Sequence, residues 1–140
     1  MISSTDILNA KILVVDDQEV NVLLLERILS GAGYACRVGG MDVIEAAGGA
    51  EGVRRAQDER PDVILLDMMM PTMDGSETLA ALRSQPATAM TPVIFLTAKA
   101  VGAEVERMRA LGAAGVLIKP FDPRTLSGDV RALIKRPLDS

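Results

Sequence analysis

The sequence predicts an α/β protein built on a parallel sheet, and two observations lead to this class. Four short apolar runs rich in β-branched residues are continuous rather than alternating, as expected for strands covered on both faces. Between the runs, apolar residues recur at helical spacing and would form the covering layers. Strands and helices thus alternate along the chain, which favours parallel strands joined by right-handed crossovers. The four runs are residues 12–15, 63–66, 93–96 and 116–118.

The first predicted helix follows the strand at residues 12–15. Its apolar face carries Leu25, Ile28, Leu29 and Ala32. Helices often end at a glycine, because glycine adopts the left-handed conformation at little cost. Gly31 and Gly33 therefore mark the expected end of this helix.

The stretch after the first helix allows two interpretations. Residues 43–46 resemble a second strand, followed by a helix over residues 50–60 that Pro61 ends. Residues 36–38 could form a strand instead, because two glycines follow them as a break. The residues alone do not choose between these two positions for the strand.

Capping signals divide the second half of the chain. Asp74 can cap a helix that begins at Gly75, with Glu77 completing a variant of the capping box. The next helix is expected to end at Gly112. Its apolar face carries Val101, Val105, Met108 and Leu111. Asp122, which precedes a proline, is a good start for the last helix. The apolar face of that helix carries Leu126, Val130 and Leu133.

The composition limits the possible function classes. The chain has 140 residues, 49% of them hydrophobic, with one cysteine and no histidine. This length corresponds to one domain. A single cysteine cannot form an internal disulfide framework or a thiolate zinc site. Without histidine, the chain cannot contain a serine–histidine or cysteine–histidine hydrolase centre, and it cannot carry its own phosphohistidine.

Charge and hydropathy indicate the expected location and partners. The net charge of −4 opposes attraction to phosphate backbones, so we expect no direct nucleic-acid partner. No apolar stretch approaches the ~18 residues of a membrane span, and the first residues lack the pattern of a signal peptide. We therefore expect a soluble, cytoplasmic protein that makes no membrane contact.

Polar side chains stand where four of the predicted strands end. Asp16 and Asp17 follow the first strand, Asp67 the third, Thr97 the fourth and Lys119 the last. Because the carboxyl ends of parallel strands share one edge of a sheet, these side chains should converge. Two carboxylates at ~4 Å repel by roughly 4 kcal/mol at an effective dielectric of about 20, so three of them need a cation. Oxygen ligands favour Mg²⁺.

The amine and the hydroxyl suit a phosphoryl group. Lys119 brings a fixed positive charge and Thr97 a hydroxyl donor, and phosphoryl transfer depends mostly on positioning and charge neutralisation. With no histidine to compete, a carboxylate is the expected nucleophile. Asp67 is the best choice, because Asp16 and Asp17 form a pair suited to holding a cation.

Each of these features also has an ordinary structural interpretation. An acid pair after a strand is more often a solvated turn, and a lysine before a proline is usually a surface charge. Residues 68–70, three methionines in a row, are more often core filler than a set of ligands. The coincidence of all five polar residues at equivalent strand ends is what favours a site.

Four segments of the chain resemble the receiver domain of two-component response regulators, including the single-domain chemotaxis type. The resemblance implies a doubly wound, five-stranded parallel sheet of flavodoxin-like order 2-1-3-4-5, with five helices. It further implies one receiver domain over residues 1–140, with residues 1–9 as an N-terminal extension and residues 36–42 as a possible insertion near the second strand. The matching segments are residues 12–17, 62–75, 92–98 and 112–123.

The resemblance also implies roles for the polar residues. Asp67 would accept the phosphoryl group, and Mg²⁺ would be held by Asp17, Asp67 and the carbonyl of Met69, with Asp16 acting largely through water. Lys119 would pair with the phosphoryl group. Thr97 would act as the switch that reshapes the output surface. The residues with these implied roles are Asp16, Asp17, Asp67, Met69, Thr97 and Lys119.

The same resemblance implies the partners. A sensor histidine kinase or a histidine phosphotransfer protein would donate the phosphoryl group, and an unidentified downstream protein would read the switched surface. Such a chain is a signalling domain that promotes its own phosphorylation and dephosphorylation, and is not an enzyme that turns over an external substrate.

The sequence departs from the family pattern at one position, and it lacks features that two other classes of protein need. Family members commonly carry an aromatic residue three positions before the lysine, where this chain has Val116. An aspartyl phosphatase of the haloacid-dehalogenase type would need a second aspartate two positions after the nucleophile, where this chain has Met69. A flavin- or nucleotide-binding module would need a glycine-rich loop after the first strand, which is here acidic.

Overall fold

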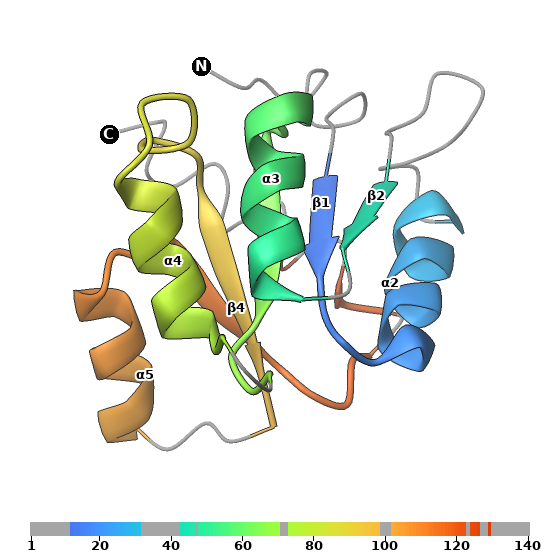
Figure 1. The fold of residues 1–140 in the computed structure, drawn as a ribbon. Helices are drawn as coiled ribbons and strands as arrows, with labels where there is room; N and C mark the ends of the chain where they lie inside the picture. The colour runs from blue at the N-terminus through green and yellow to red at the C-terminus, as the bar shows by residue number, and fades with distance from the viewer. Residues whose placement is uncertain are drawn as a thin grey trace.

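The computed structural model describes residues 12–31, 43–46, 48–70, 73–98, 102–122, 124–126 and 129, and in it strands and helices alternate (Figure 1). The strands are β1 (Ile12–Val15), β2 (Val43–Ala46), β3 (Val63–Asp67), β4 (Val93–Thr97) and β5 (Gly115–Ile118). The helices of the described part are α2 (Glu19–Gly31), α3 (Gly49–Glu59), α4 (Gly75–Arg83) and α5 (Gly102–Ala110).

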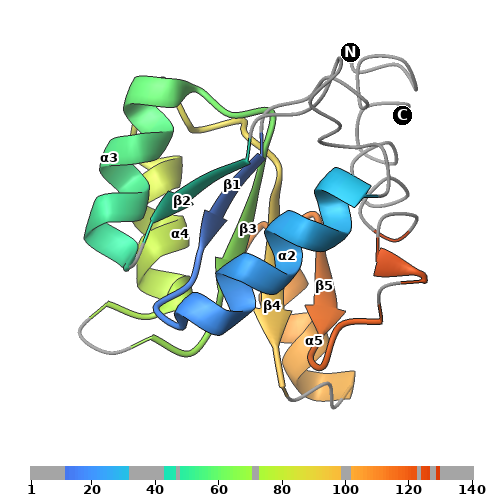
Figure 2. The ribbon, with the colours of Figure 1, turned by 90° about the vertical axis from the view of Figure 1, so that its right-hand side faces the viewer.

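The strands form one sheet in the order β2-β1-β3-β4-β5, and every neighbouring pair is parallel. Figure 2 shows α2 on one side of this sheet and α3 and α4 on the other. The predicted α/β class with a parallel sheet is therefore confirmed. Because all strands point the same way, their carboxyl ends meet along one edge, where the turns to the helices begin.

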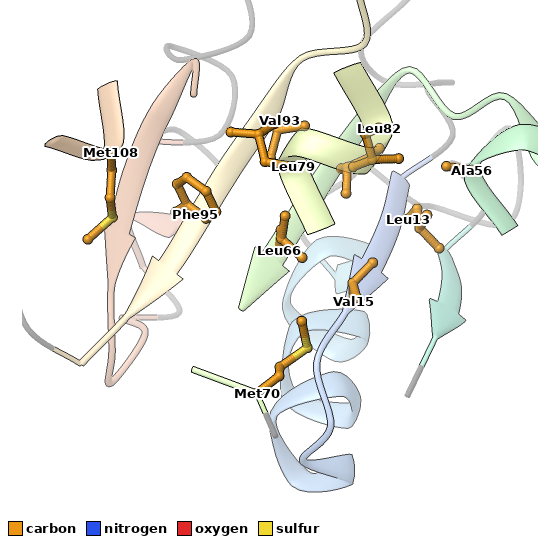
Figure 3. Packing of buried hydrophobic residues seen from close by; sticks show 11 residues of the cluster. Leu13, Val15, Ala56, Leu66, Met70, Leu79, Leu82, Val93, Phe95 and Met108 are labelled. Atoms are coloured by element: carbon orange, nitrogen blue, oxygen red, sulfur yellow. The ribbon is translucent and has the colours of Figure 1, made fainter. Parts of the chain in front are cut away.

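The strands β1, β3 and β4 are buried over their whole length. Burial on both faces explains why their sequences are continuous apolar runs. One face packs against α3, α4 and α5, and Figure 3 shows this cluster running from Met108 and Phe95 to Leu13 and Ala56. The buried residues of the cluster are Leu13, Val15, Ala56, Ile64, Leu66, Met70, Leu79, Leu82, Val93, Phe95 and Met108.

Two of the predicted local signals, one at the start of a helix and one at the end of a helix, are confirmed. The Asp74 carboxylate accepts a hydrogen bond from the Glu77 N–H at 2.9 Å, and the Glu77 carboxylate accepts one from the Asp74 N–H at 3.2 Å. The capping box is therefore confirmed. After α5, Gly112 has φ of 103°, a left-handed conformation that favours glycine, so the predicted stop at this residue is also confirmed.

Several predictions need correction or fall on residues that the structure does not describe. Leu111 is 44% exposed, so its placement on an apolar face is wrong; α5 ends at Ala110, and Leu111 belongs to the turn that follows. Residues 43–46 form the strand beside β1. The alternative at residues 36–38, the possible insertion at residues 36–42 and the extension at residues 1–9 lie outside the described residues.

The last predicted helix is described only in small part. Among its expected apolar residues, Leu126 is buried, whereas Val130 and Leu133 lie outside the described residues, as does Val101 of the preceding helix. None of the helices in the described part of the chain is long and apolar enough to cross a membrane.

Candidate functional site

Three carboxylates converge at the carboxyl edge of the sheet. Asp16 and Asp17 follow β1, and Asp67 is the last residue of the neighbouring strand β3. One carboxylate oxygen from each residue lies within 4.8 Å of the other two, a spacing at which the group could hold a metal ion. Asp16 and Asp67 are buried, whereas Asp17 is exposed. The cluster is therefore open to solvent on the side of Asp17.

Lys119 reaches the cluster from β5, across the strand β4. Its Nζ lies 3.2 Å from Oδ1 of Asp67 and 3.5 Å from Oδ2 of Asp16. Its backbone N–H donates to the carbonyl of Thr97 at 2.7 Å, which ties the start of the turn after β5 to the end of β4. One ammonium group thus faces three carboxylates, so the described cluster keeps an excess of negative charge.

Backbone donors orient the two buried carboxylates. The N–H of Gln18 donates to Oδ1 of Asp16 at 2.9 Å, and the N–H of Met69 donates to Oδ1 of Asp67 at 3.2 Å. Each donor lies two residues after the aspartate, the spacing at which an aspartate caps its own turn. The role of the Gln18 N–H was not predicted, although this spacing in the sequence indicates it.

The pKa of the Asp67 carboxyl is raised above its usual value of 3.8. Burial is the main cause and the negative charge of Asp16 is the second, while Lys119 and the Met69 N–H offset part of the rise. The protein thus makes the ionised form of Asp67 costly. A cation bound between these carboxylates would relieve that cost, so the donor set fits a hard divalent ion.

Thr97 is the last residue of β4 and is 4% exposed. It pairs in register with Ile118, the residue before Lys119. The structure therefore brings Thr97 to the edge that carries the carboxylates. Asp67 and Thr97 end their strands rather than follow them, because both strands continue one residue beyond the apolar runs.

The three consecutive methionines after Asp67 differ in their surroundings. Met70 is buried in the core cluster, as predicted for core filler. Met69 is 75% exposed, so that interpretation is wrong for its side chain. Met69 contacts the site through its backbone N–H, which donates to the Asp67 carboxylate.

The sequence matches the profile of a known protein family. The profile described as "Response regulator receiver domain" matches residues 12–131, which is most of the chain. The chain belongs to the response regulator receiver domain family. This assignment agrees with the parallel sheet and with the acidic cluster at its carboxyl edge.

Curated relatives and solved structures of receiver domains are similar along most of the chain. The alkaline phosphatase synthesis transcriptional regulatory protein PhoP of Bacillus subtilis is 41% identical over 92% of this chain, and the match covers 50% of PhoP. The chain thus spans about half the length of that relative.

Two solved structures show the same fold. Vibrio cholerae chemotaxis protein CheY4 has a TM-score of 0.79 and 36% identity, covering 89% of this chain and 98% of the other. The receiver domain of the sensor histidine kinase PA1611 from Pseudomonas aeruginosa has a TM-score of 0.76 and 31% identity, covering 91% and 98%. That structure is described with a magnesium ion coordinated in its active-site cleft.

Proposed function

We propose that this receiver domain accepts a phosphoryl group on Asp67 from a phosphohistidine of a partner protein. The observation that carries the proposal is the position of the Asp67 carboxylate, buried between Asp16 and Lys119 at the edge of the sheet. Lys119 and the Met69 N–H both engage Oδ1. Oδ2, which neither of these donors engages, is the oxygen that attacks.

The transfer moves one phosphoryl group between two covalent partners. A bond forms between Oδ2 of Asp67 and phosphorus while the phosphorus–nitrogen bond of the donor breaks. The electron pair of that bond stays on the imidazole nitrogen of the donor. The product is an acyl phosphate on Asp67, and no general acid is needed because imidazole is a good leaving group once its other nitrogen is protonated.

The carboxylates and one backbone carbonyl would hold Mg²⁺. Asp17, Asp67 and the carbonyl of Met69 are the proposed ligands, with Asp16 holding the ion through water. When bound, the ion neutralises negative charge on the phosphoryl oxygens and the carboxylates. Two observations support this assignment: one oxygen from each carboxylate lies within 4.8 Å of the other two, and the pKa of Asp67 is raised.

Lys119 and Thr97 act on the phosphoryl group after it arrives. The Lys119 ammonium, already 3.2 Å from Asp67, pairs with a phosphoryl oxygen in place of the carboxylate. The Thr97 hydroxyl donates to another oxygen and draws the end of β4 toward it. Because the Thr97 carbonyl is bonded to the Lys119 N–H, this shift reaches β5 and favours a second arrangement of the surface near α5.

These steps make the domain a signalling component and not an enzyme for an external substrate. The phosphoryl donor is a sensor histidine kinase or a histidine phosphotransfer protein, and the reader of the switched surface is a downstream protein. The net charge of −4 favours protein partners over direct contact with nucleic acid. We place the domain in the cytoplasm, where such donors expose their phosphohistidine.

Small phosphoryl donors test this function without the natural kinase. Phosphoramidate, whose phosphorus–nitrogen bond resembles that of phosphohistidine, is incubated with the chain with and without Mg²⁺, and intact mass is measured. We expect one added phosphoryl group only with Mg²⁺, none on Asp67→Asn, and wild-type labelling on Asp58→Asn, which changes an exposed aspartate of α3. Equal labelling of Asp67→Asn and the wild type would refute the proposal.

A further inference from the structure

Three helices on one side of the sheet begin with glycine. These are Gly49 of α3, Gly75 of α4 and Gly102 of α5. None of the three has a left-handed backbone conformation, so conformational freedom does not explain them. A second reason for a glycine is that a neighbouring atom leaves no room for a Cβ. The room for a Cβ differs among the three residues.

The surroundings of Gly75 leave no room for a side chain. A Cβ at this position would lie 2.7 Å from Cα of Met68 and 2.8 Å from the carbonyl oxygen of Asp67. At Gly102, which holds the same position in its helix, a Cβ would meet nothing within 4 Å. The two nearest of these atoms belong to the backbone, so they cannot rotate away as the end of a side chain could.

Gly75 also holds the same backbone by a hydrogen bond. Its N–H donates to the carbonyl of Met68 at 3.0 Å. The next residue, Met69, donates its own N–H to the Asp67 carboxylate and supplies the carbonyl proposed to bind Mg²⁺. Residues 67–70, which we call the acceptor turn, therefore contact Gly75 on one side and contribute Asp67 to the acidic cluster on the other.

Packing and hydrogen bonds hold helix α4 and the start of the acceptor turn in place. Helix α4 is held by its capping box, by a hydrogen bond from the Thr78 hydroxyl to the Asp74 carbonyl at 2.8 Å, and by buried Leu79 and Leu82. At the start of the turn, the Met68 N–H is fixed to the Leu96 carbonyl at 3.0 Å. A side chain at position 75 would therefore displace the part of the turn that follows this hydrogen bond, which includes Met69.

We propose that Gly75 is a positioning residue for Mg²⁺ binding and phosphoryl transfer. Because Gly75 has no Cβ, the acceptor turn can pack closely against α4. In that position the Met69 N–H donates to the Asp67 carboxylate. This proposal rests on the proposed function. A merely structural glycine would lower stability when replaced and leave the Mg²⁺ affinity of the folded protein unchanged. A positioning residue changes that affinity.

The test is a Mg²⁺ titration of ¹⁵N-labelled chains followed by amide NMR, which reports both folding and binding. For Gly75→Ala we expect an approximately tenfold or larger rise in the Mg²⁺ dissociation constant, the range seen when residues behind metal ligands are changed. Its Met69 amide signal should be shifted before any Mg²⁺ is added. Phosphoramidate labelling should slow in parallel at subsaturating Mg²⁺.

Two variants serve as matched controls. Gly102→Ala makes the same substitution at the same helical position in open space, and its dissociation constant should stay within about twofold of the wild type. Arg83→Met changes the far end of α4, and should lower stability without changing Mg²⁺ affinity. Together they separate the loss of stability from the loss of position.

The outcomes distinguish this proposal from the proposed function. A folded Gly75→Ala chain with wild-type Mg²⁺ affinity overturns the positioning role. A wild-type chain that shows no Mg²⁺ response overturns the proposed metal site itself. If Gly75→Ala is unfolded in buffer, the titration of all variants is repeated in sucrose, which favours the compact state, and the same comparison decides.

Discussion

The two ends of the sheet differ in whether their charged side chains are matched by other groups of the chain. At the carboxyl end, three carboxylates face one lysine, and burial beside Asp16 raises the pKa of Asp67. At the amino end, the guanidinium of Arg83 donates to three backbone carbonyls, two in the turn before β4 and one in the turn after α5. The partners are Thr91 at 2.8 Å, Gly112 at 3.2 Å and Thr88 at 3.3 Å.

The amino end uses its charge to complete the fold. Arg83 joins the end of α4 to the turn before β4 and to the turn after α5, and the buried Thr88 hydroxyl donates to the Leu82 carbonyl at 2.6 Å. Burial lowers the pKa of Arg83, but an arginine stays protonated in proteins. Here a cation is matched by acceptors of the chain itself.

The negative charge at the carboxyl end is balanced only in part by the described residues of the chain. Its carboxylates are oriented by backbone N–H groups but are not neutralised by the described residues around them. An excess of like charge costs stability, and such a cost is common where a protein binds a ligand. The charged residue at the amino end of the sheet therefore stabilises the fold, whereas the charged residues at the carboxyl end destabilise it until a cation binds.

The largest effect is expected from breaking the amino end. Arg83→Met keeps an unbranched apolar stem and removes all three hydrogen bonds, and should lower the free energy of unfolding by roughly 2–3 kcal/mol, because the carbonyls lose a charged donor. Urea unfolding followed by circular dichroism measures it. Arg109→Met, at an exposed position of α5, should change the value by less than about 0.5 kcal/mol. Equal effects would remove the contrast.

Neutralising the carboxyl end should act in the opposite direction. Asp67→Asn should raise the unfolding free energy of the Mg²⁺-free protein by roughly 1–2 kcal/mol, because a buried charge with a like neighbour is removed. Adding Mg²⁺ should stabilise the wild type and not the variant. Thermal unfolding with and without Mg²⁺ measures both. A destabilised Asp67→Asn chain would show that Lys119 already balances the cluster.

The stability difference between Asp67→Asn and the wild type should depend on pH. The folded-state pKa of Asp67 is raised, so at low pH both states carry the proton and Asp67 costs nothing. As pH rises above the usual value of 3.8, the unfolded chain loses this proton first and the folded state becomes relatively less stable. The stability difference between Asp67→Asn and the Mg²⁺-free wild type should therefore grow with pH above 3.8. A difference that is flat in pH contradicts this account.

The smallest effect concerns an acid at the carboxyl end that is already satisfied. Asp74→Ala removes the cap of α4 and should lower the unfolding free energy by about 1 kcal/mol. Hydrogen bonds from the Glu77 N–H and the Ser76 hydroxyl lower the pKa of Asp74, so its contribution is present above 3.8 and is lost as pH falls through the folded-state value. Asp74 and Asp67 should thus show opposite pH trends in urea unfolding. Parallel trends would count against the comparison.

Much of the fold could be predicted from local patterns. The buried strands appear as continuous apolar runs, and the capping box at Asp74 and the stop at Gly112 are written in adjacent residues. Leu111 shows the limit of that approach. Its spacing suits an apolar face, but whether a face continues depends on where the helix stops packing against the sheet.

The candidate site, too, could be predicted from the sequence only in part. The sequence by itself determined that acids, a hydroxyl and an amine stand at strand ends, because strand ends follow from hydrophobic patterning. Only the tertiary structure decided that Lys119 crosses β4 to reach Asp67, that Arg83 binds carbonyls of two separate turns, and that Gly75 lies against the acceptor turn. These contacts join residues separated along the chain or depend on how closely two backbones approach. Such distances arise from packing and are not encoded in the spacing of residues.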